Sequence, residues 1–188
     1  MLTTSAPKRE RLIEAAQILF YHQGVNRTTL ADIAQQAQVP LGNIYYHFRT
    51  KEALVESVIE AYEHALHALF TQWESLSNPR QRLLALLASS RTQEPVLARY
   101  GCPHGTLCQE LDKEDTALAQ IGARIFQAYL DWAQAQWMQL GKSEQEAKDL
   151  AIDLISSLQG TFVLTATFRM PELLERKLQR LETWVHNI

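Results

Sequence analysis

Polar side chains that could contact a nucleic acid are concentrated in one stretch of the sequence, VPLGNIYYHFRTKEAL. Within it, Asn43 carries an amide that can pair with the edge of adenine. Tyr45, Tyr46 and His47 carry O–H and N–H groups that suit phosphate oxygens. Gly42 has no side chain, so the backbone there could approach a ligand closely. This combination predicts a surface that contacts double-stranded DNA.

The residues around this stretch predict a helix-turn-helix. Gly24 ends a first helix, and Thr29 can cap a second one, with Asp32 as its partner in a capping box. A break follows at Gln38, and Pro40 can open a third helix because its missing N–H is no loss at that position. In such a unit the second of the two joined helices enters the major groove and its N-terminal residues meet base edges.

Further groups near this unit could hold phosphates. Lys51 opens the next helix, where a cation is poorly placed for the helix dipole and a phosphate contact would explain it. Thr28 and Thr29, at the start of the second helix, offer a hydroxyl and backbone N–H groups. Ile44 and Phe48 are four residues apart and should face the core instead.

The charge of the chain is distributed unevenly. Residues 1–51 hold six Lys or Arg against three Asp or Glu and carry +3, whereas the remainder carries −6 within a total of −3. An asymmetry of this kind indicates a polyanionic partner at the N-terminal end.

The composition is that of an ordinary soluble globular protein. The chain has 188 residues, 46% of them hydrophobic and 21% charged. No apolar run reaches the ~18 residues that a membrane span needs, and the first residues lack a signal-peptide apolar region. We therefore expect a cytoplasmic protein without a membrane partner.

The hydrophobic spacing predicts an all-α fold of three short helices followed by about six longer ones. A loop is expected at YGCPHG, residues 100–105, and SEQE forms a capping box for a helix that ends near Phe168. We expect a helix-turn-helix domain over residues 1–50 and a helical ligand-binding and dimerisation domain over residues 51–188.

The segment TTLADIAQQAQVPLGNIYYHFRTKEAL resembles the DNA-binding region of TetR/AcrR-type transcriptional regulators. One departure is Gln38, where the family usually has Gly, and a left-handed backbone there would cost Gln ~1 kcal/mol or more. The resemblance implies a homodimer, usually a repressor. The expected DNA contacts are Thr28, Thr29, Pro40, Leu41, Gly42, Asn43, Tyr45, Tyr46, His47 and Lys51.

A dimer of this kind must hold its two recognition helices ~34–36 Å apart, so that they reach successive major grooves. The last two helices, over about 144–166 and 171–187, are the best candidates for the contact between subunits. The alternative is that their apolar stripes pack inside one subunit. The expected dimer contacts are Leu154, Leu158, Thr161, Thr165, Leu174, Leu178, Leu181 and Val185.

Large side chains in the middle helices could surround an apolar or aromatic effector of modest size. Most aromatic residues at helical spacing are core, which is the alternative for each of them. Arg91, Arg99, His104 or Arg124 could meet a polar end of the ligand. The expected ligand-binding residues are Trp73, Tyr100, Cys102, His104, Leu107, Phe126, Tyr129, Trp132 and Phe162.

The two cysteines leave three possibilities open. Cys102, His104 and Cys108 lie within seven residues and could bind zinc or copper, although their spacing is not that of a zinc finger. Cys108 could also sense oxidants or electrophiles if a helix dipole lowered the pKa of its thiol. Inert, half-buried thiols are the third possibility. A redox- or metal-sensing repressor that uses these cysteines is therefore the alternative function.

Other classes of function find little support. The sequence contains no G-x-S-x-G, phosphate-loop or H-E-x-x-H motif, so neither an enzyme nor a cofactor is expected. A purely structural helical module would not need a glycine, an amide and several donors arranged around a turn.

Overall fold

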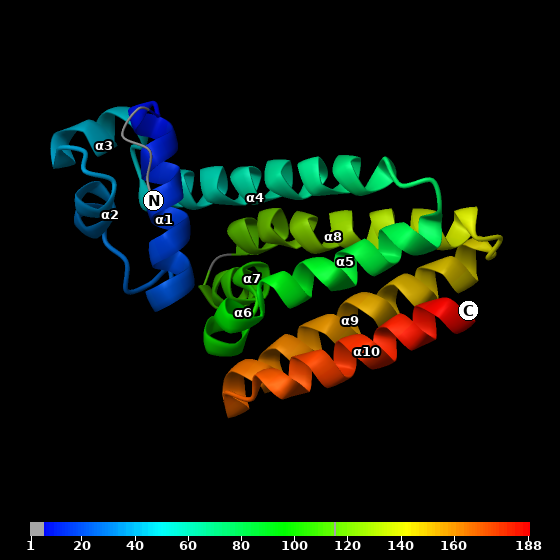
Figure 1. The fold of residues 1–188 in the computed structure, drawn as a ribbon. Coiled ribbons are helices and arrows are strands. Elements are labelled where there is room, and N and C mark those ends of the chain that lie inside the picture. The colour runs from blue at the N-terminus through cyan, green and yellow to red at the C-terminus, as the bar shows by residue number, and fades with distance from the viewer. Residues whose placement is uncertain (1–5, 115) are drawn as a thin grey trace. The chain divides into compact units, whose positions relative to one another are not determined.

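The computed structural model describes residues 6–114 and 116–188, and within them it contains ten α-helices and no strand (Figure 1). The all-α prediction is confirmed. The helices are α1 (Lys8–Gln23), α2 (Leu30–Gln36), α3 (Leu41–His47), α4 (Lys51–Glu74), α5 (Pro79–Thr92), α6 (Glu94–Tyr100), α7 (Pro103–Glu114), α8 (Thr116–Gln139), α9 (Glu144–Phe168) and α10 (Pro171–Asn187).

Several helix ends follow from local chemistry. Thr29 accepts a hydrogen bond from the backbone of Asp32, and Asp32 accepts one from the backbone of Thr29, so the predicted capping box is present. The Thr29 hydroxyl, which donates to Asp32 Oδ2 at 2.7 Å, and then the Thr29 backbone N–H lower the pKa of the Asp32 carboxyl. Gly24 ends α1 with φ +88°, a conformation that glycine adopts without strain. Asn78 caps α5 and is followed by Pro79 at the first helical position.

The predicted loop over residues 100–105 is largely helical, and this part of the prediction is wrong. Gly101, with φ +77°, separates α6 from α7, and Pro103 already begins α7. Proline is favoured at the first position of a helix, which explains why α7 begins at Pro103. A Cβ on Gly105 would lie 2.9 Å from Gln159 Oε1, so the absent side chain lets α7 pack closely against α9 at this point. The prediction of about nine helices missed this division.

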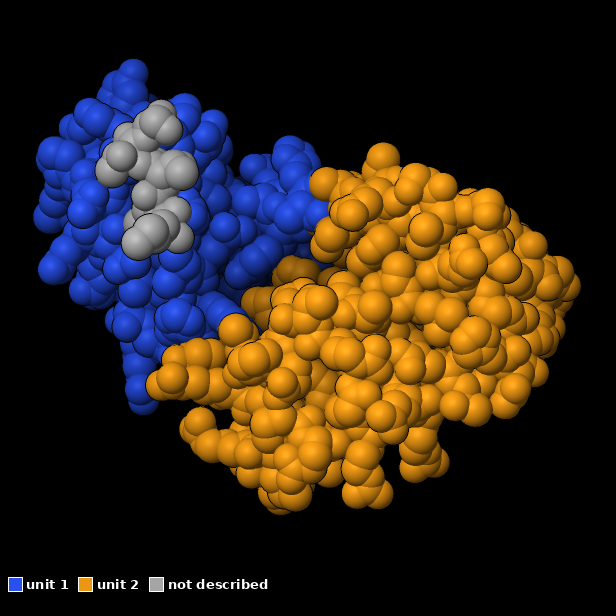
Figure 2. All heavy atoms as spheres, in the orientation of Figure 1, with its two compact units in different colours: residues 1–65, 106–125 blue, residues 66–105, 126–188 orange. Residues whose placement is uncertain are grey.

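The chain divides into two compact units (Figure 2). The head unit comprises residues 1–65 and 106–125, and the body unit comprises residues 66–105 and 126–188. Three helices, α4, α7 and α8, each contribute residues to both units. The domains predicted from the sequence, 1–50 and 51–188, remain a prediction.

Within the body unit, α10 packs against α5, α6 and α9. Arg91 of α5 binds Glu175 and Glu182 of α10 at 2.8 and 2.9 Å. Among the described residues, α9 is the one helix long and apolar enough to cross a bilayer, but it also buries a full face in the body unit, as core helices do.

The buried faces of α9 and α10 correct the dimer residues predicted from the sequence. All eight side chains are at most 7% exposed within a single subunit, which leaves them no surface for a second subunit. The alternative, that these stripes pack inside one subunit, is confirmed for Leu154, Leu158, Thr161, Thr165, Leu174, Leu178, Leu181 and Val185.

Candidate nucleic-acid interface

Helix α3 has a buried face and an exposed face within the head unit. Ile44 is completely buried and Phe48 is nearly so, which anchors the helix on the core. Tyr45 and Tyr46 are 54% and 86% exposed, an unusual state for large aromatic side chains. A Cβ on Gly42 would meet nothing within 4 Å, so internal packing does not require glycine there. The exposed face is therefore a surface that an external partner could contact.

The other predicted contacts lie beside this face. Pro40 precedes α3, and its carbonyl accepts a hydrogen bond from the Asn43 backbone N–H at 2.8 Å. The His47 ring meets the Tyr46 ring edge-on at 5.1 Å between centroids. Leu41 is exposed, and Lys51 begins α4 after α3 and a short connection. The fold thus gathers these residues, and their contact with DNA stays a prediction.

The turn between α2 and α3 depends on a left-handed residue. Gln38 adopts φ +53°, the conformation that a glycine would favour. The Arg11 guanidinium of α1 donates hydrogen bonds to the carbonyls of Ala37 and Gln38, the second at 2.9 Å. Arg11 therefore stabilises the turn between α2 and α3. The sequence shows the charge of Arg11 but not this contact.

Arg9 also serves the fold of the head unit. It donates to Ser57 Oγ at 3.0 Å and its guanidinium lies 5.3 Å from the centre of the Phe48 ring. Two of the six cations counted in residues 1–51 therefore have internal partners. Lys8, Arg27 and Arg49 are exposed and can attract a polyanion.

The structure corrects the prediction for Thr28. Its side chain is buried, and its hydroxyl donates to the Gly24 carbonyl at 2.7 Å and accepts from Gln23 Nε2 at 3.2 Å. A hydroxyl so placed cannot bind a phosphate. Thr29 is exposed, but its hydroxyl is engaged with Asp32 in the cap, which leaves backbone N–H groups as the donors near that position.

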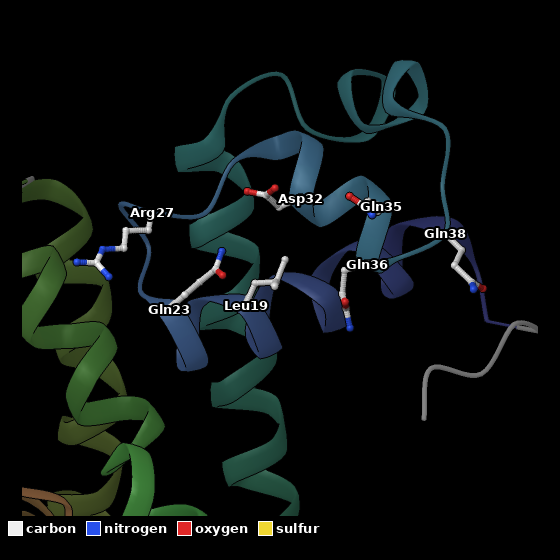
Figure 3. Close-up of a pocket in the computed structure, with 7 residues that line it drawn as sticks. All are labelled: Leu19, Gln23, Arg27, Asp32, Gln35, Gln36 and Gln38. Atoms are coloured by element: carbon white, nitrogen blue, oxygen red, sulfur yellow. The ribbon is translucent and has the colours of Figure 1, made fainter.

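An open polar hollow of about 960 Å³ lies between α1 and α2 (Figure 3). Seven residues line it, and four of them are glutamines. Pockets for small organic molecules are lined mainly by apolar side chains, so this hollow is not suited to such a ligand. The lining residues are Leu19, Gln23, Arg27, Asp32, Gln35, Gln36 and Gln38.

Aromatic side chains form a continuous cluster in the body unit. The rings of Phe70 and Trp132 stack 4.7 Å apart at 5°, and Trp73 packs on Trp132 at 5.3 Å. Phe70 also meets Tyr129 edge-on at 5.8 Å, and Phe126 lies 6.3 Å from Tyr129. Phe70 was missed in the sequence, although its spacing of three from Trp73 places both on one helix face.

The polar groups next to this cluster are uncharged. Tyr129 Oη lies 3.4 Å from His104 Nδ1, and Gln159 Nε2 donates to Cys102 Sγ at 3.6 Å. Burial lowers the pKa of His104 to about 4 and raises the pKa values of Cys102 and Tyr129. At neutral pH the imidazole, thiol and phenol are therefore all neutral.

Not all predicted ligand residues join this cluster. Leu107 belongs to the head unit, where it is buried. The Tyr100 ring lies under the Arg99 guanidinium, and Phe162 is buried on α9. Of the four polar candidates, Arg91 binds two glutamates and Arg124 binds Glu63 at 3.0 Å.

The two cysteines have separate partners. Cys102 belongs to the body unit, whereas Cys108 belongs to the head unit and lies 3.4 Å from the Gly122 carbonyl. In the part of the chain that the structure describes, no three His, Cys, Asp or Glu side chains are grouped so that they could hold a metal ion. The raised pKa of Cys102 disfavours the reactive thiolate.

Comparisons with known proteins agree with this arrangement. Residues 12–58 match the family described as bacterial regulatory proteins, tetR family, and residues 80–179 match the transcriptional regulator LmrA/YxaF-like C-terminal domain. The HTH-type transcriptional regulator LmrA of Bacillus subtilis (strain 168) is 28% identical over 185 residues, which cover 89% of this chain and 97% of LmrA.

A second relative matches the head. The HTH-type transcriptional regulator TtgR of Pseudomonas putida is 48% identical over 64 residues, which cover 32% of this chain and 30% of TtgR. The crystal structure of a TetR transcriptional regulator from Legionella pneumophila has the same fold, with a TM-score of 0.85. The two chains are 19% identical, and the match covers 96% of this chain and 98% of that one. The chain belongs to the TetR family of bacterial transcriptional regulators, with a C-terminal domain of the LmrA/YxaF-like type.

Proposed function

We propose that this protein is a ligand-responsive repressor that binds a palindromic operator as a homodimer and is released by a small apolar or aromatic effector. The observation that carries the proposal is α3, which has a buried Ile44 on one side and two exposed tyrosines on the other. An exposed, donor-bearing helix after a tight turn suits the major groove.

Selection of bound duplexes from a random pool tests the DNA-binding part. The proposal predicts a palindrome whose half-sites are centred about 10 base pairs apart, or a multiple of that distance. Affinity should fall steeply with salt, because most of it comes from phosphate contacts. A selected pool without any shared sequence would contradict the proposal.

The outer face of α9 is the surface that we assign to the homodimer. Ile152, Val163, Leu164 and Phe168 are 44–59% exposed there, outside the buried face of the helix. A Cβ on Gly160 would meet nothing within 4 Å, so a crossing helix could approach closely at this point. The same helix therefore supports a dimer, but through the face that sequence reasoning left out.

Charge supports the same assignment. Asp149 and Asp153 are exposed on α9, and Arg176 and Arg180 line an open hollow of about 540 Å³ on α10. In a two-fold dimer the two aspartates of one subunit can meet the two arginines of its partner, and the reverse contact follows from the symmetry.

Replacement of Leu164 by Asp tests the dimer face. This change should raise the dimer dissociation constant by about a hundredfold or more, because it places a charge in an apolar contact. Sedimentation velocity measures it, and Leu69→Asp, an exposed leucine on α4, serves as the matched control. An unchanged Leu164→Asp dimer would contradict the assignment of this face.

The aromatic cluster of the body unit supports the effector part of the proposal. Its neutral His104, Cys102 and Tyr129 favour a ligand without net charge, because no buried ionic partner is available among them. Titration of Trp fluorescence with neutral aromatic compounds, and with carboxylate analogues of the same shape, tests this preference. Tighter binding of the charged analogues would contradict it.

The neutral state of Cys102 weighs against the alternative function, a thiol-based sensor. Replacement of both cysteines by serine decides between the two. The proposal predicts that the double variant keeps DNA binding and effector release. Loss of oxidant- or zinc-induced release in that variant would favour the alternative.

A further inference from the structure

Glu110 of α7 makes a contact with the DNA-binding head that the function proposed above does not account for. Its Oε2 atom accepts a hydrogen bond from the backbone N–H of Val25 at 2.6 Å, and both residues belong to the head unit. Val25 directly follows Gly24, the residue that ends α1. A short bond from an amide to a carboxylate is of the stronger, charge-assisted kind.

The turn after α1 is built to receive this carboxylate. A Cβ on Gly24 would lie 2.6 Å from Glu110 Oε1 and 3.1 Å from Oε2, so any other residue would displace the side chain. Val25 is buried, and a buried N–H needs a partner, which Glu110 supplies. Two separate features of the turn, an absent side chain and an amide, therefore point to the same carboxylate.

The hydrogen bonds within this turn set the position of α2. The Thr28 backbone N–H donates to the Val25 carbonyl at 3.2 Å, and the Thr28 hydroxyl donates to the Gly24 carbonyl at 2.7 Å. The next residue, Thr29, is the cap of α2, which packs against α3. A continuous set of hydrogen bonds thus leads from Glu110 to the start of the helix-turn-helix.

Helix α7 also carries residues of the body unit. Its first three residues, including His104, belong to that unit, and its remaining residues belong to the head unit. Gly105 and Glu110 are separated by about 8 Å of continuous helix at the usual rise per residue. Glu110 therefore lies on the same continuous helix as residues of the body unit.

The carboxylate has room to leave the turn. A hollow of about 200 Å³ lies beside it in the head unit, lined also by Asn26, Lys51 and Glu52. Glu110 can therefore leave Val25 without displacing packed side chains.

We infer that Glu110 is a positioning residue, which holds the α1–α2 turn, and through it the recognition helix, in the orientation that reads DNA. This inference rests on the proposed function. Replacement of Glu110 by Ala should weaken binding to the selected operator about tenfold or more, the range of one charge-assisted hydrogen bond. Binding to a random duplex should change by less than about twofold, because phosphate contacts do not depend on the register of the head.

A second measurement is made on the free protein, without DNA. Amide hydrogen exchange of residues 24–28 should accelerate about tenfold or more in Glu110→Ala, whereas exchange in α9 should not change. Glu110→Gln keeps an acceptor oxygen without the charge, so both effects should be intermediate. Asp112→Asn, an exposed acid on the same helix, is the matched control and should behave as the wild type.

The outcomes separate this inference from the proposed function. Unchanged exchange at residues 24–28 in Glu110→Ala overturns the inference. Faster exchange with unchanged operator affinity also overturns it, because the turn would then not position the head. If the wild type selects no duplex at all, the proposed function fails, and the exchange rates alone decide whether Glu110 holds the turn.

Discussion

Replacement of Gln38 by Gly probes the turn of the helix-turn-helix most sharply. Gln38 adopts φ +53°, where a residue with a Cβ is less stable than glycine by ~1–2 kcal/mol. Glycine has more freedom in the unfolded chain, which offsets about 0.4–1 kcal/mol of that gain. The Gln38 side chain is exposed, and the carbonyl that accepts from Arg11 is kept in the variant. Gln38→Gly should therefore raise the free energy of unfolding by ~0.5–1 kcal/mol.

Urea denaturation followed by circular dichroism measures this change, and two variants calibrate it. Arg169 caps α9 in the body unit with the same φ of +53°, so Arg169→Gly should give a similar gain away from the head. Gln35 is exposed within α2, so Gln35→Gly should instead lose roughly 0.5–1 kcal/mol.

The contrary result would be that Arg169→Gly stabilises the protein and Gln38→Gly does not. That result would mean that the backbone at residue 38 is not left-handed in solution. Operator affinity of Gln38→Gly should stay within about twofold of the wild type, because the path of the backbone does not change.

Three further changes test other parts of the structure. Arg11→Met should lower the free energy of unfolding by roughly 1.5–3 kcal/mol in urea, because the carbonyls of Ala37 and Gln38 lose a charged donor; an equal stability would refute this role. The His104 pKa of about 4 lies below its unfolded value of 6.5, so the unfolded chain binds the extra proton between these values. The contribution of His104 to the free energy of unfolding should be fully present above about pH 6.5 and fall by roughly 3 kcal/mol as the pH drops towards 4. His104→Phe should reduce this dependence on pH in urea titrations. The same dependence in the variant and the wild type would contradict the prediction. Arg91→Met should lower the free energy of unfolding by only about 1 kcal/mol, and by less in high salt, because its ion pairs are half exposed. A larger loss that does not depend on salt, measured in thermal melts, would contradict this prediction.

Much of the fold followed from the sequence because local signals were strong. The capping box at Thr29 and the glycine after α1 each predicted a helix end that the structure contains. The family resemblance, the all-α class and a regulator rather than an enzyme are confirmed. The predicted left-handed cost at Gln38 also corresponds to its observed φ of +53°.

The errors arose where one pattern is compatible with two environments. Leu174 and Leu178 repeat as a seam, and periodicity alone cannot distinguish an interface between subunits from a core inside one subunit. Thr28 and Thr29 are adjacent hydroxyl residues, and only the path of the turn shows that the first points inward. The contact from Glu110 to Val25 spans 85 positions of the sequence and had no local signal.

Binding of an Asn43→Ala variant to the selected operator decides whether α3 reads bases in the major groove. Fluorescence anisotropy on the operator and on a scrambled duplex gives the specificity of each protein. We expect a loss of ~1–3 kcal/mol on the operator, about five- to 150-fold, and little change on the scrambled duplex. If the variant keeps the full preference of the wild type for the operator, α3 does not read bases through Asn43.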